Sequence, residues 1–234
     1  MNFKIDPKIL ERFPGLNIGV VIIKSADNSG ASEEILTQLK EREDRIKSAQ
    51  PDLSTEPKIE SWRKAYAAFG AKPKEDRSSV ENLYRLVLRG VSLRHINKLV
   101  DIYNLISLKH TLPVGGEDTD KIKGDILLTF AGPNETPVLL LGDKEPHPPK
   151  AGEVVYKDGI STICRRWNWR EADRTKLTEQ TKNCILVIEG LPPISRQEIE
   201  SATSELARLV EKHCKAVVSW KVLHHAEPES PSLL

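Results

Sequence analysis

The spacing of apolar residues changes near the middle of the chain, from a helical pattern to strand-like runs, and this change limits the folds that the chain can adopt. Upstream of the Pro113–Gly116 turn, apolar residues recur at the spacing of amphipathic helices. The helices expected there cover residues 31–49, 57–69, 79–89 and 93–108. Downstream, Leu- and Val-rich runs bounded by Gly, Pro and Asn predict short strands over residues 125–130, 137–141, 153–157 and 184–189. Helices followed by strands predict an α+β fold with mixed β-sheets and several flanking helices.

The two ends of the chain extend this pattern. Residues 6–12 predict a short helical turn, and the Val- and Ile-rich run 17–24 predicts a strand. Residues 216–223 predict a closing strand. The segment 226–234 is rich in Pro, Ser and Glu and predicts a disordered tail. We therefore expect one domain over residues 1–225.

Local signals mark where elements begin and turn. Ser78 with Glu81, and Ser195 with Glu198, have the spacing of capping boxes and predict two helix starts. The pair Asp158-Gly159 lies between two apolar runs and predicts a tight hairpin.

Composition narrows the class of protein. With 234 residues and 38% hydrophobic content, the chain can bury a substantial core. No apolar run approaches the roughly 20 residues that span a bilayer. Asp6, Pro7 and Glu11 stand where a signal peptide would be apolar, so we expect a cytoplasmic protein without membrane contact.

The cysteines and the absence of several known motifs limit the kinds of chemistry that we expect of this chain. Cys164, Cys184 and Cys214 lie far apart without C-x-x-C spacing, which favours buried reduced thiols over disulfides or a zinc site. The sequence contains no G-x-G-x-x-G, no G-x-x-x-x-G-K-[ST], no H-E-x-x-H and no G-x-S-x-G. We therefore expect no cofactor, neither nucleotide nor metal.

A short row of polar residues runs along the helix expected over residues 93–108. Asn97, Asp101 and Asn104 recur at i, i+4 and i+7. Small amide and carboxylate groups flanked by Ile and Leu suit a concave site that needs fixed donors and acceptors. The same spacing fits a solvent-exposed face, and spacing alone leaves both interpretations open.

Two basic clusters are candidates for nucleic-acid contact, because a net charge of +1 provides no global electrostatic attraction. The first includes Arg85 and Arg89. The second runs from Arg165 to Lys176 and includes the hexapeptide 165–170, Arg-Arg-Trp-Asn-Trp-Arg, whose guanidinium groups and indole rings can hold phosphates and stack on bases. Both clusters also fit solvated surface and ordinary packing at a strand end.

From about residue 62 to residue 190 the sequence resembles the B3/B4 domain, the tRNA-editing region of bacterial phenylalanyl-tRNA synthetase β subunits. Residues 100–105, Val-Asp-Ile-Tyr-Asn-Leu, are similar to the synthetase segment Val-Asp-Val-Thr-Asn-Tyr. Residues 112–118 follow at the separation of its Gln-Pro-Leu-His-Ala-Phe-Asp segment. Residues 155–159 resemble its strand ending in Asp-Gly, and residues 178–182 resemble its Thr-Glu-x-Thr segment. The resemblance implies a freestanding B3/B4-type domain with tRNA, and a synthetase, as candidate partners.

The resemblance also implies a reaction and some of its residues. The family site hydrolyses the ester between a wrong amino acid and the tRNA end, and its functional asparagine corresponds to Asn104. The family histidine falls on Gly115, the glutamate that recognises tyrosine falls on Lys176, and a Met-Gly-Gly turn is replaced by residues 166–169. Tyrosine specificity is therefore not carried over.

These considerations define candidate site residues for an editing-type aminoacyl-tRNA hydrolase. The candidate catalytic residues are Asn104, Ser107, His110, Gly115 and Gly116. The candidate substrate-binding residues are Asn97, Asp101, Asp118 and Asn168. The candidate tRNA-binding residues are Arg85, Arg89, Arg165, Arg166 and Trp167. The alternative hypothesis is a non-catalytic module that binds RNA or an amino-acid-like small ligand, so enzymatic activity stays open at this point.

Overall fold

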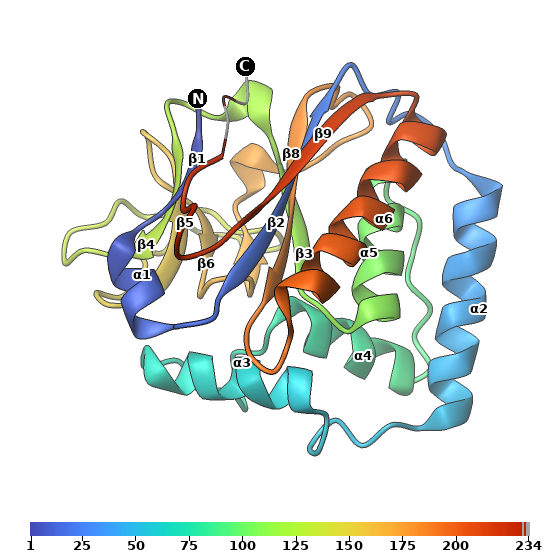
Figure 1. The fold of residues 1–234 in the computed structure, drawn as a ribbon, viewed down its shortest axis with the longest axis horizontal. Helices are drawn as coiled ribbons and strands as arrows, with labels where there is room; N and C mark the ends of the chain where they lie inside the picture. The colour runs from blue at the N-terminus through green and yellow to red at the C-terminus, as the bar shows by residue number, and fades with distance from the viewer. Residues whose placement is uncertain (231, 233–234) are drawn as a thin grey trace.

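The computed structural model describes residues 1–230 and 232, which fold into two β-sheets and a helical layer (Figure 1). The five-stranded sheet has the order β1 (Phe3–Ile5), β4 (Ile126–Phe130), β5 (Val154–Lys157), β6 (Thr162–Arg165), β7 (Arg170–Glu171). The four-stranded sheet has the order β3 (Val114–Asp118), β8 (Cys184–Gly190), β2 (Asn17–Lys24), β9 (Val217–Leu223). β1 runs parallel to β4, and the other neighbouring strands pair antiparallel. This architecture confirms the predicted α+β class.

Strand β2 shows why the sheets stack. Every residue of β2 except the last is buried. Ile18, Val20 and Ile22 pack into a core between the two sheets, whereas Val21 and Ile23 pack into a second core beneath the helices. Because side chains alternate across a strand, an apolar run at both odd and even positions requires a covering layer on each face.

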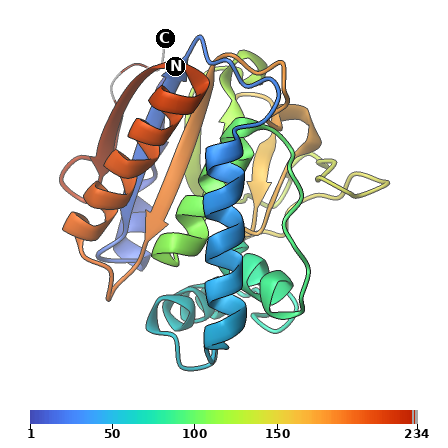
Figure 2. The ribbon, with the colours of Figure 1, turned by 90° about the vertical axis from the view of Figure 1, so that its right-hand side faces the viewer.

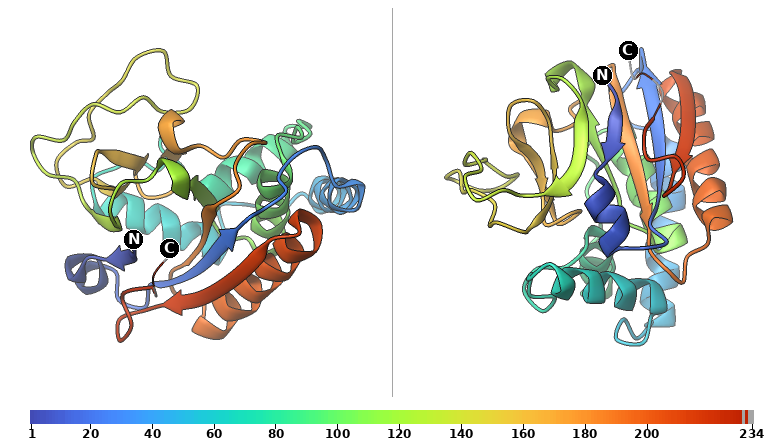
Figure 3. Two further views of the ribbon diagram at one scale, coloured as in Figure 1. Left: turned by 90° about the horizontal axis from the view of Figure 1, so that it is seen from above. Right: turned by 60° about the vertical axis from the view of Figure 1, so that its left-hand side comes forward.

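A layer of helices covers the face of the four-stranded sheet that points away from the other sheet (Figures 2 and 3). α6 (Arg196–Cys214) packs on β2, β8 and β9, and α5 (Lys98–His110) packs on β3 and α6. α2 (Glu33–Ala49) and α4 (Ser79–Leu88) both pack on α5. α1 (Pro7–Arg12) contacts β4, and α3 (Pro57–Ala68) contributes Trp62 and Tyr66 to the core between the sheets. Two short 3-10 helices, η1 (Thr119–Lys121) and η2 (Asp173–Thr175), follow β3 and β7.

The start of α5 differs from the sequence-based expectation. Helical structure expected from Leu93 begins at Lys98, because the Asn97 side chain accepts a hydrogen bond from the Val100 N–H at 3.1 Å. Asn97 is thus an N-cap residue, which the periodicity of the apolar residues concealed. The chain from 91 to 97 forms neither helix nor strand before this cap.

The two predicted capping boxes have different outcomes. At Ser195 both halves of the box are formed with Glu198. α4 does begin after Ser78, but the Ser78 side chain makes no capping hydrogen bond. Glu81 instead pairs with arginine side chains, including Arg63 at 2.9 Å, so the capping-box prediction is wrong at this helix.

A hairpin forms at Asp158-Gly159 as predicted, with β5 and β6 paired antiparallel, but its connection has four residues, 158–161, where the Asp-Gly pair predicts two. The Asp158 carboxylate accepts hydrogen bonds from the Ile160 and Ser161 N–H groups at 2.9 and 3.0 Å. By contrast, the strand expected over residues 137–141 is reduced to isolated bridges at Val138 and Leu140.

The chain after β9 returns to β1. Pro228 accepts a hydrogen bond from the Ile5 N–H, and Ser230 donates its N–H to Phe3, both at 2.9 Å. The described part of the predicted disordered tail therefore pairs with β1, while residues 231, 233 and 234 lie outside the described residues. In the part of the chain that the structure describes, no helix is both long and apolar enough to cross a membrane.

Candidate functional site

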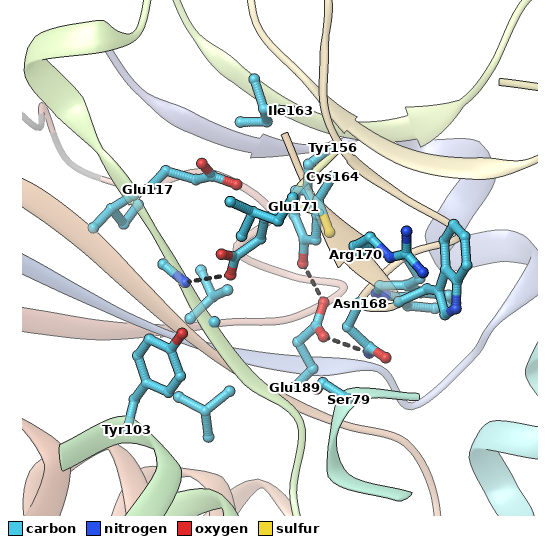
Figure 4. Close-up of a pocket in the computed structure, with 18 of the residues that line it drawn as sticks. Ser79, Tyr103, Glu117, Tyr156, Ile163, Cys164, Asn168, Arg170, Glu171 and Glu189 are labelled. Atoms are coloured by element: carbon cyan, nitrogen blue, oxygen red, sulfur yellow. Dashed lines mark hydrogen bonds between the residues drawn. The ribbon is translucent and has the colours of Figure 1, made fainter. Parts of the chain in front are cut away.

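A pocket of about 250 Å³ lies between the two sheets, bordered by α4 and α5 (Figure 4). The five-stranded sheet contributes a cross-strand row in which Tyr156 pairs with Cys164, and Cys164 pairs with Glu171. Directly paired residues project from the same face of a sheet, so all three side chains meet the pocket together. The facing surface comes from β3 and β8.

The register of β3 against β8 places a second set of side chains on that facing surface. Gly115 pairs with Val187, and Glu117 pairs with Ile185. Glu189 follows two residues after Val187 and therefore projects from the same face of β8. Figure 4 shows the side chains of Glu117, Glu171 and Glu189 directed into one space from three different strands.

The glycine pair in β3 creates room for Glu171. The Gly116 N–H donates a hydrogen bond to Glu171 Oε1 at 3.2 Å. A Cβ on Gly115 would lie 2.9 Å from that same oxygen, so any side chain there would displace the carboxylate. Gly116 is more constrained, because its Cβ would lie 2.2 Å from Leu186 and 2.8 Å from the Ile185 carbonyl oxygen. Glycine at 115 thus permits a carboxylate from β7 to occupy this position.

Burial alters the acidity of the Glu117–Glu171 pair. Burial raises the pKa of Glu117 well above its ordinary value, and the neighbouring Glu171 charge raises it further. Burial raises the pKa of Glu171 from 4.5 to about 7, opposed by the Gly116 N–H hydrogen bond. A carboxyl group that titrates near neutral pH can accept or donate a proton under physiological conditions.

Glu189 is the centre of a hydrogen-bonded network at the base of the pocket. Its carboxylate accepts hydrogen bonds from the Tyr156 hydroxyl and from Asn168 Nδ2, the latter at 2.6 Å. Asn168 Oδ1 in turn accepts a hydrogen bond from the Tyr66 hydroxyl at 3.0 Å. Glu189 is 1% exposed, and burial raises its pKa from 4.5 to about 7.

Aromatic packing holds the turn between β6 and β7 in an unusual backbone conformation. Arg166 and Trp167 have φ angles of 46° and 66°, the left-handed region that glycine adopts most readily. The Trp167 indole is fully buried against Phe13 and Trp62, with ring centroids 4.8 and 5.0 Å away. The backbone N–H of Trp167 donates to the Val154 carbonyl at 2.6 Å, so burial of the ring and this hydrogen bond stabilise a turn that lacks glycine.

The structure brings five of the sequence-predicted site residues together. The pocket is lined by Asn104, Gly115, Gly116, Trp167 and Asn168. Asn104 reaches it from α5 beside Tyr103, and Asn168 reaches it from the β6–β7 turn. These five residues come from three separate segments.

Five other predicted residues are engaged elsewhere. Asn97 caps α5, and the Asp101 carboxylate is 2.6 Å from His95 Nδ1. The Ser107 hydroxyl donates to the Leu112 carbonyl at 2.7 Å. The remaining two are likewise paired outside the pocket: His110 with Glu205 at 2.8 Å, and Asp118 with the Thr181 hydroxyl at 2.7 Å. Only Asn104 of the predicted polar row lines the pocket, because the other members serve the helix start and the core.

Most of the predicted tRNA-binding arginines form ion pairs within the protein. Arg165 is buried and makes two hydrogen bonds of 2.9 Å to Glu153. Arg166 pairs with Asp76 at 2.9 Å, and Arg85 pairs with Glu81 at 2.8 Å. Arg89 is exposed at the end of α4.

A different arginine, Arg170, lines the pocket. Its guanidinium lies 4.4 Å from the centroid of the Trp169 ring, and Arg166 lies 4.2 Å from that centroid. Arg170 also pairs with Asp143 at 2.5 Å and remains 38% exposed. Trp169 and Arg170 of this stack line the pocket, whereas the sequence predicted Arg165, Arg166 and Trp167 of the same hexapeptide.

Sequence reasoning missed the three glutamates and the tyrosines Tyr103 and Tyr156. A usable signal was present for Glu189, which ends the apolar run of β8, since a carboxylate at the end of a buried strand needs a special environment. Glu117 follows two glycines in a short strand. Glu171 had no local signal, because its position depends on pairing across the sheet.

Together, the fold and the site define an α+β domain with an acidic pocket enclosed between two sheets. Over residues 61–216 the sequence matches the B3/4 domain. That match covers more than half of the chain, and the protein belongs to the B3/4 domain family.

The chain is also similar to individual proteins. It is 34% identical over 101 residues to the phenylalanine–tRNA ligase β subunit of Ruegeria pomeroyi, covering 42% of this chain but only 12% of that subunit. It is 19% identical over 214 residues to the uncharacterized protein YhzB of Bacillus subtilis, covering 91% of this chain and 94% of YhzB. A crystallised N-terminal fragment of the phenylalanyl-tRNA synthetase β-subunit from Pyrococcus horikoshii matches 92% of this chain and 49% of its own at 13% identity, with a TM-score of 0.47.

Proposed function

We propose that this B3/4 protein hydrolyses the ester between an amino acid and tRNA, as an editing-type deacylase that acts on tRNA charged elsewhere. The observation that supports this most is Glu171, a carboxyl group with a pKa of about 7 beside the Gly115–Gly116 backbone and in the same pocket as Asn104. Similarity to the Ruegeria pomeroyi ligase β subunit supports tRNA as the substrate and a synthetase as a candidate partner. Such a reaction belongs in the cytoplasm, where tRNA is charged and used.

The proposed step uses Glu171 as a general base. Its carboxylate accepts a proton from a water molecule while the water oxygen bonds to the ester carbonyl carbon. The Asn104 amide donates a hydrogen bond to the developing oxyanion. The bond to the ribose oxygen then breaks, that oxygen takes up the proton, and the products are the free amino acid and uncharged tRNA.

Recognition of the tRNA end is assigned to the pocket rim. The Trp169 ring and the half-exposed Arg170 guanidinium could stack on the terminal base and contact its phosphate. These two residues replace Arg165 and Trp167 in that role, because Arg165 is paired to Glu153 and Trp167 is buried.

The test is a deacylation screen across a panel of mischarged tRNAs. We expect the unmutated protein to release the amino acid from at least one of them faster than the protein-free reaction. Asn104→Ala should lower that rate by about 100-fold, the typical cost of removing one oxyanion donor. The matched control is Asn134→Ala, at an exposed loop position outside the pocket, which should retain the full rate. Equal rates for the Asn104 and Asn134 variants would refute the assignment.

A second candidate is a non-catalytic module that binds an amino-acid-like small ligand. The ion pairs of Arg85, Arg165 and Arg166 favour it, because they leave little free positive charge for RNA. Thermal stabilisation by free amino acids, with no deacylation of any ester and no salt-dependent tRNA binding, would select this candidate.

A further inference from the structure

The pocket contains more acidic side chains than basic ones. Among the described residues, three carboxyl groups line it, from Glu117, Glu171 and Glu189, against a single lining cation, Arg170, which is paired with Asp143. Glu189 is satisfied by the Tyr156 hydroxyl and the Asn168 amide. The other two carboxyl groups, those of Glu117 and Glu171, have fewer donors, and Glu171 accepts the Gly116 N–H at 3.2 Å.

Glu117 is the strongest indication of a ligand. Glu117 is 8% exposed, and its Oε2 atom is buried without a hydrogen bond of normal geometry from the described residues, although the Thr175 hydroxyl is close enough to lower its pKa. Figure 4 shows this carboxylate directed toward the same space as that of Glu171. A buried acceptor without a donor is unfavourable, and a ligand that brings donors to this place removes the penalty.

We infer that the ligand of this pocket carries a protonated primary amino group, which Glu117 and Glu171 bind together, and an apolar body that packs on Tyr103 and Tyr156. The cationic class of the ligand follows from the pocket alone. Its identification as the α-amino group of an aminoacyl ester rests on the proposed function.

The chemistry of the pocket favours an ammonium group over other cations. An ammonium group offers three donors that can reach two carboxylates at once, whereas a quaternary amine offers none. A metal ion is a poorer fit, because the described residues contain no group of three or more His, Cys, Asp or Glu placed to hold one. The ring faces and Leu83, Leu86 and Val187 provide the apolar contact that an amino-acid side chain needs.

Matched pairs of small probes test the inference on the unmutated protein. We would measure binding of phenethylamine and isoamylamine by calorimetry and thermal shift, against phenethyl alcohol and isoamyl alcohol, which have the same shape without the charge. The amines should bind roughly tenfold more tightly than the alcohols, as expected for charge-assisted hydrogen bonds. Alcohols that bind as tightly as the amines would overturn the inference, and so would the absence of binding by either class.

A variant identifies the carboxylate involved. Glu117→Gln should lower the affinity for the amines by about tenfold and leave the affinity for the alcohols unchanged, which also shows that the variant is folded. An amine affinity that this substitution does not change would contradict the role of Glu117.

The two proposals can fail separately. Selective binding of the amines by a protein that deacylates no tRNA rejects the deacylase and supports the ligand class. Hydrolysis of N-acetyl-aminoacyl-tRNA as fast as that of aminoacyl-tRNA would reject the role of the amino group, while the deacylase assignment would stand.

Discussion

Glu189 permits a quantitative test of how the pocket affects the stability of the protein. We consider the substitution Glu189→Gln, which keeps the shape of the side chain and removes its charge. The amide oxygen can still accept a hydrogen bond from Asn168, and the amide nitrogen can donate to the Tyr156 hydroxyl oxygen. The substitution therefore isolates the cost of the buried charge.

The magnitude follows from the altered pKa. Burial raises the pKa of Glu189 from 4.5 to about 7, so the folded protein holds the proton more tightly than the unfolded chain does. The corresponding stabilisation is present below about pH 4.5 and is lost as the pH rises through about 7. At about 1.4 kcal/mol for each tenfold change in proton affinity, the loss amounts to roughly 3 kcal/mol. Glutamine has no such loss.

Urea unfolding across a pH series measures this effect as a difference between two proteins. The free energy of unfolding of Glu189→Gln, relative to the unmutated protein, should rise by roughly 3 kcal/mol between about pH 4.5 and about pH 8. Taking the difference removes the titration of groups that both proteins share. Glu179→Gln, at an exposed position, is the control and should show no such rise. A relative stability that stays flat within about 0.5 kcal/mol over this range would refute the reasoning.

Two further predictions concern the glycine pair and the buried ion pair. Gly116→Ala should destabilise the protein by about 2 kcal/mol in urea unfolding, because its Cβ meets backbone. Gly115→Ala should destabilise the protein less and should mainly slow deacylation, because its Cβ displaces Glu171. Equal losses of stability for the two variants would contradict the geometry. Arg165→Ala should destabilise by about 3–5 kcal/mol, because it leaves the Glu153 charge buried and unpaired. The tRNA affinity of folded Arg165→Ala should be unchanged, and a selective loss of that affinity would restore Arg165 to the RNA-binding surface.

The sequence predicted the elements of the fold well where local periodicity decides. The strand 17–24 and the capping box at Ser195 are confirmed, since each depends on residues close together in the chain. The start of α5 and the chain ends were harder. Asn97 looked like one member of a helical row, and only its bond to Val100 identifies it as a cap.

The site was only partly predictable for the same physical reason. Asn104 and Gly115 were found because their segments resemble an editing domain, and Asn168 because it lies in the hexapeptide 165–170; all three line one pocket. Glu171 and Glu189 come from strands in different sheets, and no spacing along the chain reports that two sheets face each other. Arg165 likewise looked like a surface residue in the sequence. It is buried because its guanidinium group pairs with the buried Glu153 carboxylate, which lies 12 residues away in the chain.

The most direct test of the central claim is the pH–rate profile of aminoacyl-tRNA deacylation, with the protein-free rate subtracted, for the unmutated protein and for Glu171→Gln. The rate of the unmutated protein should rise as the Glu117–Glu171 pair ionises, with an inflection at about pH 7 that follows the pKa of Glu171. Glu171→Gln should remove the inflection and lower the rate by roughly 100-fold at the plateau. A Glu171→Gln variant that retains both the inflection and the rate would contradict the account, and so would a protein that adds nothing to the protein-free rate on any mischarged tRNA.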